Sequence, residues 1–364
     1  MTNLKEKIEN KERISFKGKN IFVGLDVHKK NWTATVYVEQ QFIKTFHFES
    51  DGEILYKYLI KNYPYGNYHA CYEAGFCGFS VYRQLEAFGI KCTVVNPCDI
   101  PQTQKGSLSK TDASDSKRIA ESFSKQMLKG IYIPNKVSEA DRNLIRYRSK
   151  VQKDLKSKRQ QVKSTLNIYG IKIPQQHDKP YWTLNFIKWV QSLPIDEKSA
   201  KITMSSLIED VLFFRNKLLT TNKQIKLLSQ SEEYKETFAL LCTIPGIGLI
   251  TAMTLITEVV DINRFESFIK FNSYIGLCPS EFSSGEKERK GKMTNRSNKK
   301  IRSLIIESAW IAIRNDPALT LKYQELIVSK SYKRAIVIIA RKLLSRLYSV
   351  WKTKKAYEKG VLKY

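Results

Sequence analysis

The sequence predicts an α/β domain at the N-terminus, followed by two mainly helical regions. Three apolar, strand-like segments joined by short turns lie between residues 21 and 48, and helical and strand-like patterns alternate after them. Beyond residue 136, apolar residues recur every three to four positions over long stretches, which is typical of helices. We expect a flexible basic tail over 1–19, the α/β domain over 20–135, a helical hairpin or coiled coil over 136–235 and a C-terminal domain over 236–355.

The charge of the chain indicates a polyanionic partner. Lys and Arg number 62 against 35 Asp and Glu, a formal net charge of +27. Basic side chains that neutralise phosphates release counter-ions and gain affinity, so we expect nucleic acid. A membrane surface is the weaker alternative because the charge is spread along the chain. The first residues lack the apolar core of a signal peptide, which predicts a cytoplasmic protein.

Two further features bound the class of protein. The longest uncharged run, 240–257, has about the length of a membrane span. It contains Pro245, Gly246 and Gly248, which favour a buried helix-turn-helix instead. The six cysteines form no CxxC pair, so we expect small buried side chains in a reducing compartment and no zinc site.

The first third of the chain has a recognisable order of elements. Strands are predicted over 21–27, 31–38 and 42–48, and a helix over 51–63. A strand over 69–75, a helix over 78–89, a strand over 90–97 and a helix capped by Ser109 or Thr111 then follow. The order β-β-β-α-β-α-β-α is that of the ribonuclease H and Holliday-junction-resolvase (RuvC-like) superfamily.

Four carboxylates fall where that fold keeps its metal ligands. Asp26 lies on the first strand and Glu73 ends the strand expected beside it, while Asp112 and Asp115 share a helix face. Such a cluster would repel itself without cations, so we expect two Mg²⁺ ions, which prefer oxygen ligands and can activate a phosphodiester.

Each of these acids also has an ordinary interpretation. Asp112 and Asp115 could simply favour the start of a helix, and Glu73 could be a rim charge. Asp26 is the strongest candidate, because an unpaired carboxylate in an apolar strand costs several kcal/mol. His28 points to the same strand face and is a minor candidate, since a lone histidine is more often structural.

The middle of the chain predicts two long helices. The first, over 139–168, carries basic residues that we interpret as a nucleic-acid track, among them Arg142, Arg146, Lys150 and Lys153. The second covers 204–228. The two pack as an antiparallel hairpin or coiled coil, within one chain or, as we favour, between subunits.

The last third contains a glycine turn and a serine beside many cations. In "IPGIG", Gly246 and Gly248 match a helix-hairpin-helix turn that binds phosphate, or else a tight turn in a helical core. Ser283 and Ser284 are ordinary turn residues or, beside cations, a nucleophile for phosphate. The basic candidates for nucleic-acid contact are Lys287, Arg289, Lys290, Lys292, Arg296, Lys299 and Lys300.

Taken together, "GLDVHK", "KTDxxDS", "IPGIG" and "PSEFSSG" resemble the DEDD transposases of insertion-sequence family one-ten, over about residues 20 to 350. The resemblance implies a recombinase that cuts and rejoins donor and target DNA with Mg²⁺ and a noncoding bridge RNA. It implies that Asp26, Glu73, Asp112 and Asp115 bind metal and that Ser283 is the nucleophile. A homo-oligomer, dimer or tetramer, would form through the coiled coil. The family often has a basic residue between the paired aspartates, where Ala113 and Ser114 stand here, which bears on nucleic-acid contacts.

Two rival functions remain compatible with the residues. One is a metal-dependent, junction-resolving nuclease in which water attacks and Ser283 is structural. The other is a non-catalytic protein that binds nucleic acid, although the presence of all four acids argues against it.

Overall fold

The computed structural model describes residues 15–102, 111–177, 182–281, 290–294 and 297–360. The chain forms two compact units, unit 1 over 1–133 and unit 2 over 134–364. The predicted further boundary near residue 235, inside unit 2, stays a prediction.

Unit 1 contains a five-stranded mixed sheet with the order β3-β2-β1-β4-β5. Strands β2 and β3 continue from β1 as an antiparallel meander, whereas β4 lies parallel to β1, and β5 parallel to β4. This arrangement confirms the predicted α/β domain and places the fourth strand beside the first. The strands are β1 (Asn20–Val27), β2 (Asn31–Val38), β3 (Gln41–Glu49), β4 (Asn67–Glu73) and β5 (Lys91–Val95).

Helices cover both faces of this sheet. Helices α2 (Gly52–Asn62) and α3 (Ser80–Ala87) supply Leu55 and Leu85 to the apolar core under one face. Helix α5 (Asp112–Ser124) packs across β1 and β2 on the other, after the short 3-10 helix η1 (Pro97–Asp99). Alternation in β2 predicts one buried face, but Thr33 and Thr35 on the other face are buried too, because α5 covers them.

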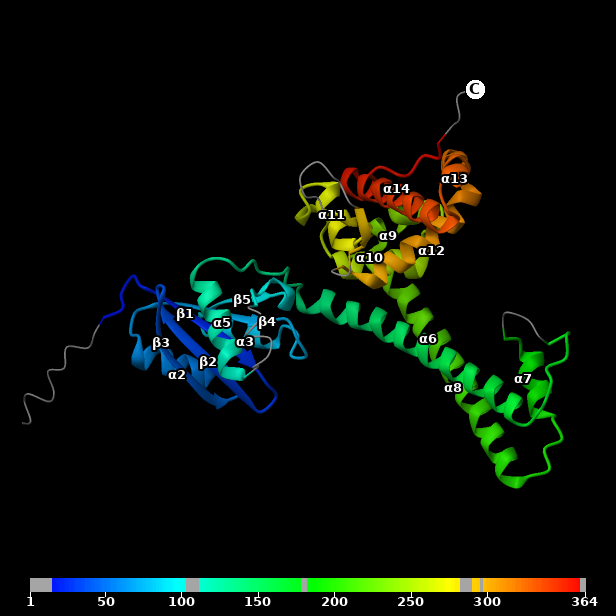
Figure 1. The fold of residues 1–364 in the computed structure, drawn as a ribbon, viewed down its shortest axis with the longest axis horizontal. Helices are drawn as coiled ribbons and strands as arrows, with labels where there is room; N and C mark the ends of the chain where they lie inside the picture. The colour runs from blue at the N-terminus through cyan, green and yellow to red at the C-terminus, as the bar shows by residue number, and fades with distance from the viewer. Residues whose placement is uncertain (1–14, 103–110, 178–181, 282–289, 295–296, 361–364) are drawn as a thin grey trace, which may run out of the picture. The chain divides into compact units, whose positions relative to one another are not determined.

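Unit 2 begins with two long helices that run side by side, α6 (Lys136–Ile168) and α8 (Lys198–Leu228) (Figure 1). Their direction is antiparallel, since Arg148 donates to Asn222 at 3.0 Å and Lys158 pairs with Asp210 at 2.7 Å. Leu155 and Val162 of α6 share a core with α8 and with α7 (Leu184–Gln191). The helices therefore form a hairpin within one chain, and a coiled coil between subunits stays a prediction.

The remainder of unit 2 is mainly helical. Helix α10 lies at its centre, and Met253, Leu255 and Val259 on it are fully buried. No helix in the described part of the chain is long and apolar enough to cross a membrane, and the uncharged run 240–257 is divided between α9 and α10. The elements are α9 (Lys235–Cys242), α10 (Leu249–Val259), the 3-10 helix η2 (Ile262–Arg264), α11 (Phe268–Ile275), β6 (Pro279–Glu281), β7 (Lys290–Met293), α12 (Lys299–Asn315), α13 (Pro317–Ser329) and α14 (Tyr332–Thr353).

The cysteines follow the prediction in part. All six are free, and Cys71 and Cys92 are buried in unit 1. Cys98 is exposed, so the expectation of burial is wrong there, because this residue lies in η1, beyond the sheet.

Candidate metal centre

Strand β1 and helix α5 approach each other unusually closely at Gly24. A Cβ atom on residue 24 would lie 2.3 Å from both the amide nitrogen of Ala120 and the carbonyl oxygen of Ser116. Glycine is the residue that permits such an approach of two backbones. Because Asp26 follows two residues later on the same face of β1, this contact brings the Asp26 backbone up to α5.

The start of helix α5 is defined by its cap. The Thr111 side chain accepts a hydrogen bond from the Ser114 backbone amide at 3.2 Å, and the Ser114 hydroxyl accepts one from the Thr111 amide at 3.1 Å. This reciprocal capping box makes Asp112 the first residue of the helix. Thr111 is therefore the cap, which confirms one of the two predicted alternatives. The other, Ser109, lies outside the described residues.

His28 lies between two of the predicted acids. Its Nε2 atom is 3.2 Å from the Asp26 Oδ2 atom and 3.5 Å from the Asp112 Oδ1 atom. These three residues are the group, within the described part of the chain, whose ligand atoms lie close enough together to hold a metal ion. The side chain of His28 is half exposed, so the group is open to solvent.

Asp115 lies deeper than Asp112 on the same helix. Its side chain is 10% exposed, against 59% for Asp112, and accepts a hydrogen bond of 2.7 Å from Arg118. The three aspartates nevertheless interact: burial, and then the charges of Asp112 and Asp115, raise the pKa of Asp26 above its usual range. His28 opposes this rise. The site is therefore a concentration of negative charge.

Glu73 ends the strand next to Asp26. The parallel register pairs Leu25 with Tyr72, so Asp26 and Glu73 occupy the next position on each strand and face the same side of the sheet. Glu73 is half-buried and does not belong to the compact group of His28 and two aspartates. The structure thus brings Asp26 and Asp112 together, with Asp115 deeper on α5 and Glu73 at the end of the neighbouring strand β4.

The donor set suits a hard divalent cation. Carboxylate oxygens are the ligands that Mg²⁺ prefers. Burial and, after it, the charges of Asp112 and Asp115 raise the pKa of Asp26, and a cation would offset those like charges. Gly24 was not among the predicted residues, and His28, predicted as a minor candidate, lies within the compact group. Both carried a signal: a glycine inside an apolar strand marks a close backbone approach, and a residue two positions after Asp26 shares its face.

Two family models match separate stretches of the chain. Residues 23–171 match a transposase model of the DEDD type from IS110 elements, and residues 238–324 match the transposase IS116/IS110/IS902 family. The first match contains all four acids, and the second contains the glycine turn and Ser283. The chain belongs to the IS110 family of DNA transposases.

Named relatives agree with this assignment. The chain is 30% identical to a putative transposase, y4qE, of Sinorhizobium fredii over 66% of its own length and 57% of that relative's length. It is 26% identical to the transposase for insertion sequence element IS1533 of Leptospira borgpetersenii, over 80% of this chain and 85% of the relative. It is 22% identical to the transposase for IS1111A of Coxiella burnetii, over 85% and 86%.

In this transposase, three of the predicted basic contacts bind other groups of the same unit. Arg146 donates two hydrogen bonds of 2.8 Å to the carboxylate of Glu258, whose side chain is 4% exposed. Arg142 donates to the carbonyl of Thr257 at 2.9 Å, and Lys300 to that of Ile145 at 3.3 Å. These cations stabilise the contacts of α6 with α10 and α12.

The acid that attracts them was not anticipated. Glu258 lies at the end of the apolar run that forms α10, and a buried carboxylate requires cationic partners. That position was the signal in the sequence. Lys150 and Lys153 on α6 and Lys299 on α12 are exposed, as a nucleic-acid contact requires, and the Arg146 side chain is 54% exposed beside its ion pair.

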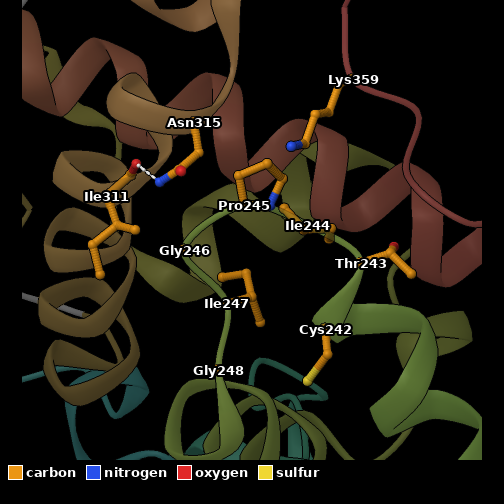
Figure 2. Close-up of a pocket in the computed structure, with 10 residues that line it drawn as sticks. All are labelled: Cys242, Thr243, Ile244, Pro245, Gly246, Ile247, Gly248, Ile311, Asn315 and Lys359. Atoms are coloured by element: carbon orange, nitrogen blue, oxygen red, sulfur yellow. Dashed lines mark hydrogen bonds between the residues drawn. The ribbon is translucent and has the colours of Figure 1, made fainter.

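The glycine turn of the transposase borders an open pocket of about 470 Å³. Figure 2 shows Cys242 and Thr243 on one side of the turn, and Ile311 and Asn315 of α12 on the other. Gly246 has a φ of +85°, and a Cβ there would lie 2.3 Å from the carbonyl oxygen of Ser308. Gly248 caps α10, and among the described residues none except its two chain neighbours has a heavy atom within 4 Å of the Cβ that an alanine there would carry.

The predicted nucleophile Ser283 lies outside the described residues, as do Ser284, Lys287, Arg289 and Arg296. The strands on either side of it, β6 and β7, pair antiparallel. Strand β7 contains Lys290 and Lys292, two of the predicted nucleic-acid contacts. Arg302 donates hydrogen bonds to the carbonyl of Thr294, directly after β7, at 2.7 Å and to the carbonyl of Gly276, before β6, at 3.2 Å.

Proposed function

We propose that the protein is an RNA-guided transposase that cuts and rejoins DNA strands of an insertion sequence. The observation that carries the proposal is the meeting of Asp26 from β1 and Asp112 from α5, both within 3.5 Å of His28. A noncoding bridge RNA would pair with donor and target DNA and so choose the sites. The family membership supports the reaction class.

Asp26, Glu73, Asp112 and Asp115 would hold two Mg²⁺ ions. When bound, Mg²⁺ polarises a phosphodiester and stabilises the charge that develops on its oxygens. Exposed Asp112 lies on the solvent side, where DNA can approach, while buried Asp115 is held by Arg118. The acids therefore have distinct tasks: Asp112 faces substrate, and Asp115 anchors the inner side of the site.

Ser283 would supply the attacking hydroxyl. Its oxygen bonds to the phosphorus, the bond from phosphorus to the adjacent sugar oxygen breaks, and the serine proton is transferred to leave a free hydroxyl on the released strand. The acids belong to unit 1 and Ser283 to unit 2, so cleavage requires both units, from one chain or from two subunits. Exposed Phe213 and Leu219 on α8 support self-association into a dimer or tetramer.

Nucleic acid would be held by the exposed cations. Lys150 and Lys153 on α6 offer phosphate contacts, and Lys299 adds one on α12. The amides around Gly246 and Gly248 would approach a phosphate as a helix-hairpin-helix turn does. The net charge of +27 supports binding of both RNA and DNA.

The experiment combines purified protein, labelled donor and target DNA, and RNA transcribed from the sequence flanking its own gene. We expect strand cleavage that requires the RNA and a divalent cation and is lost in Asp112→Asn. Unrelated RNA of equal length, at physiological salt, is the control. Full cleavage in EDTA would refute the metal site, and equal cleavage with unrelated RNA would refute guidance.

A further inference from the structure

The histidine of the metal centre is not one of the four acids, yet it touches two of them. We propose that His28 is a metal ligand through its Nε2 atom and that it shifts the preference of the site from Mg²⁺ towards Mn²⁺. The inference rests on the metal site of the proposed function and specifies its ion chemistry.

The spacing of the three side chains fits ligands that share an ion. Two ligands at right angles on an ion about 2.1 Å away lie about 3 Å apart. The Nε2 atom of His28 is 3.2 Å from Asp26 Oδ2 and 3.5 Å from Asp112 Oδ1. One imidazole nitrogen therefore faces one oxygen from each carboxylate at the distance that neighbouring ligands adopt.

The backbone holds His28 in this position. The His28 amide donates a hydrogen bond of 3.2 Å to the carbonyl of Asn31, the residue that begins β2. Residues two apart on an extended segment share a face, so the side chains of His28 and Asp26 lie on the same side of the sheet, the side that α5 covers. The imidazole is thus presented by the tight turn between β1 and β2.

The chemistry of the donor atom predicts the change in metal preference. Mg²⁺ takes oxygen ligands almost exclusively, whereas transition metals accept an imidazole nitrogen readily. Mn²⁺ carries the same charge as Mg²⁺ and accepts a mixed set of carboxylates and imidazole. A site of carboxylates alone would distinguish the two ions less.

The competing role for His28 is that of a counter-ion. A protonated imidazole between Asp26 and Asp112 would offset their repulsion in the metal-free protein and leave when a cation binds. In that case, removing the histidine would leave Mn²⁺ affinity unchanged or would increase it. The two roles therefore predict opposite results.

The test uses Mn²⁺ alone with the full-length protein and needs no DNA. Pulsed electron paramagnetic resonance detects a nitrogen nucleus bonded to Mn²⁺ as ¹⁴N modulation. The chain has four histidines, and His47 is the matched control: it is exposed and shares a hydrogen bond of 2.8 Å with Thr33, which pairs with Asp26 across the strands. We expect ¹⁴N modulation in the wild type and in His47→Asn, and none in His28→Asn.

Calorimetric titrations complete the design. His28→Asn should weaken Mn²⁺ binding at least about tenfold and Mg²⁺ binding less than about threefold. Modulation that persists in His28→Asn, or equal effects on the two ions, would overturn the role of His28 while leaving the proposed metal site intact. If the wild type binds neither ion, the metal site itself fails. Asp112→Asn should weaken both ions, which separates the two conclusions.

Discussion

Gly24 of β1 packs directly against the backbone of Ala120 on α5, so closely that any side chain on residue 24 would overlap it. This contact sets how near Asp26 comes to Asp112. It makes a residue without chemical function decisive for the geometry of the site.

Gly24→Ala should therefore separate the strand from the helix. The added Cβ would meet the Ala120 nitrogen and the Ser116 oxygen at 2.3 Å, and neither backbone atom can rotate away. We expect a loss of about 1–3 kcal/mol in the free energy of unfolding, with weaker metal binding. Denaturant unfolding and Mn²⁺ titration measure these effects. Gly75→Ala is the control, since its Cβ would meet nothing nearer than 3.8 Å; an equal effect there would contradict this explanation.

Asp26→Asn should abolish DNA cleavage and yet stabilise the metal-free fold at neutral pH. Burial and the charges of Asp112 and Asp115 raise the pKa of Asp26, so its contribution to stability is present at low pH and lost as pH rises through the folded-state pKa. The variant does not ionise and avoids this loss. We expect a melting temperature higher by roughly a few degrees at pH 7 in EDTA, and a smaller difference near about pH 4. A lower melting temperature at pH 7 would contradict the prediction.

Glu258→Gln should destabilise unit 2 in a manner that depends on pH. Burial by itself would raise the pKa of Glu258, but the hydrogen bonds and charge of Arg146, with the charge of Arg142, lower it below 4.5. The ionised carboxylate therefore stabilises the fold at neutral pH, and this is lost as pH falls through the lowered pKa. We expect the free energy of unfolding to fall by about 3–5 kcal/mol near neutral pH, and this difference from the wild type to become smaller in acid. Glu325→Gln, on an exposed pair with Lys322, should cost less than about 1 kcal/mol; a cost for Glu258→Gln that does not change with pH would refute the account.

Alanine at the two turn glycines should separate folding from DNA binding. Gly246→Ala meets a positive φ and the Ser308 carbonyl, so we expect it to destabilise unit 2 by about 1–3 kcal/mol. The Cβ of Gly248→Ala would meet no other atom of the described segments within 4 Å, its chain neighbours aside, and the variant should fold normally. If the turn binds phosphate, the methyl group of this alanine lies where the DNA backbone approaches. The affinity for DNA, measured by fluorescence titration, should then fall about tenfold. Unchanged affinity would show that the turn is only part of the helical core.

Ser283→Ala should bind RNA and DNA normally and form no covalent product. The wild type, incubated with RNA, Mg²⁺ and labelled DNA and then denatured, should yield a protein–DNA band. Ser284→Ala is the adjacent control and should retain the band, because only one hydroxyl is the nucleophile. Normal cleavage by Ser283→Ala, or cleavage without a band in the wild type, would favour the hydrolytic nuclease.

Local patterns in the sequence were enough to predict most elements of unit 1. Strand alternation, the helix predicted over 78–89 and the threonine cap depend on neighbouring residues, so a single sequence reveals them. The placement of Asp26 and Glu73 on adjacent strands followed from the order of elements. Asp26 could be named because a charge in an apolar strand is conspicuous, and the other three carboxylates because of their place in the order of elements.

Only the tertiary structure decided which side chains meet. Arg146 and Glu258 are 112 positions apart, and nothing in the pattern around Arg146 predicts that it, and not Lys150, pairs with a buried acid. The packing of α6 against α10 buries the Glu258 carboxylate and pairs it with Arg146, whose own side chain stays 54% exposed. The proximity of His28 to Asp112 likewise depends on packing, because the contact of Gly24 with α5 brings Asp112 to the end of β1. Residue types and periods are local properties, whereas distances between distant segments depend on packing, and packing determined this site.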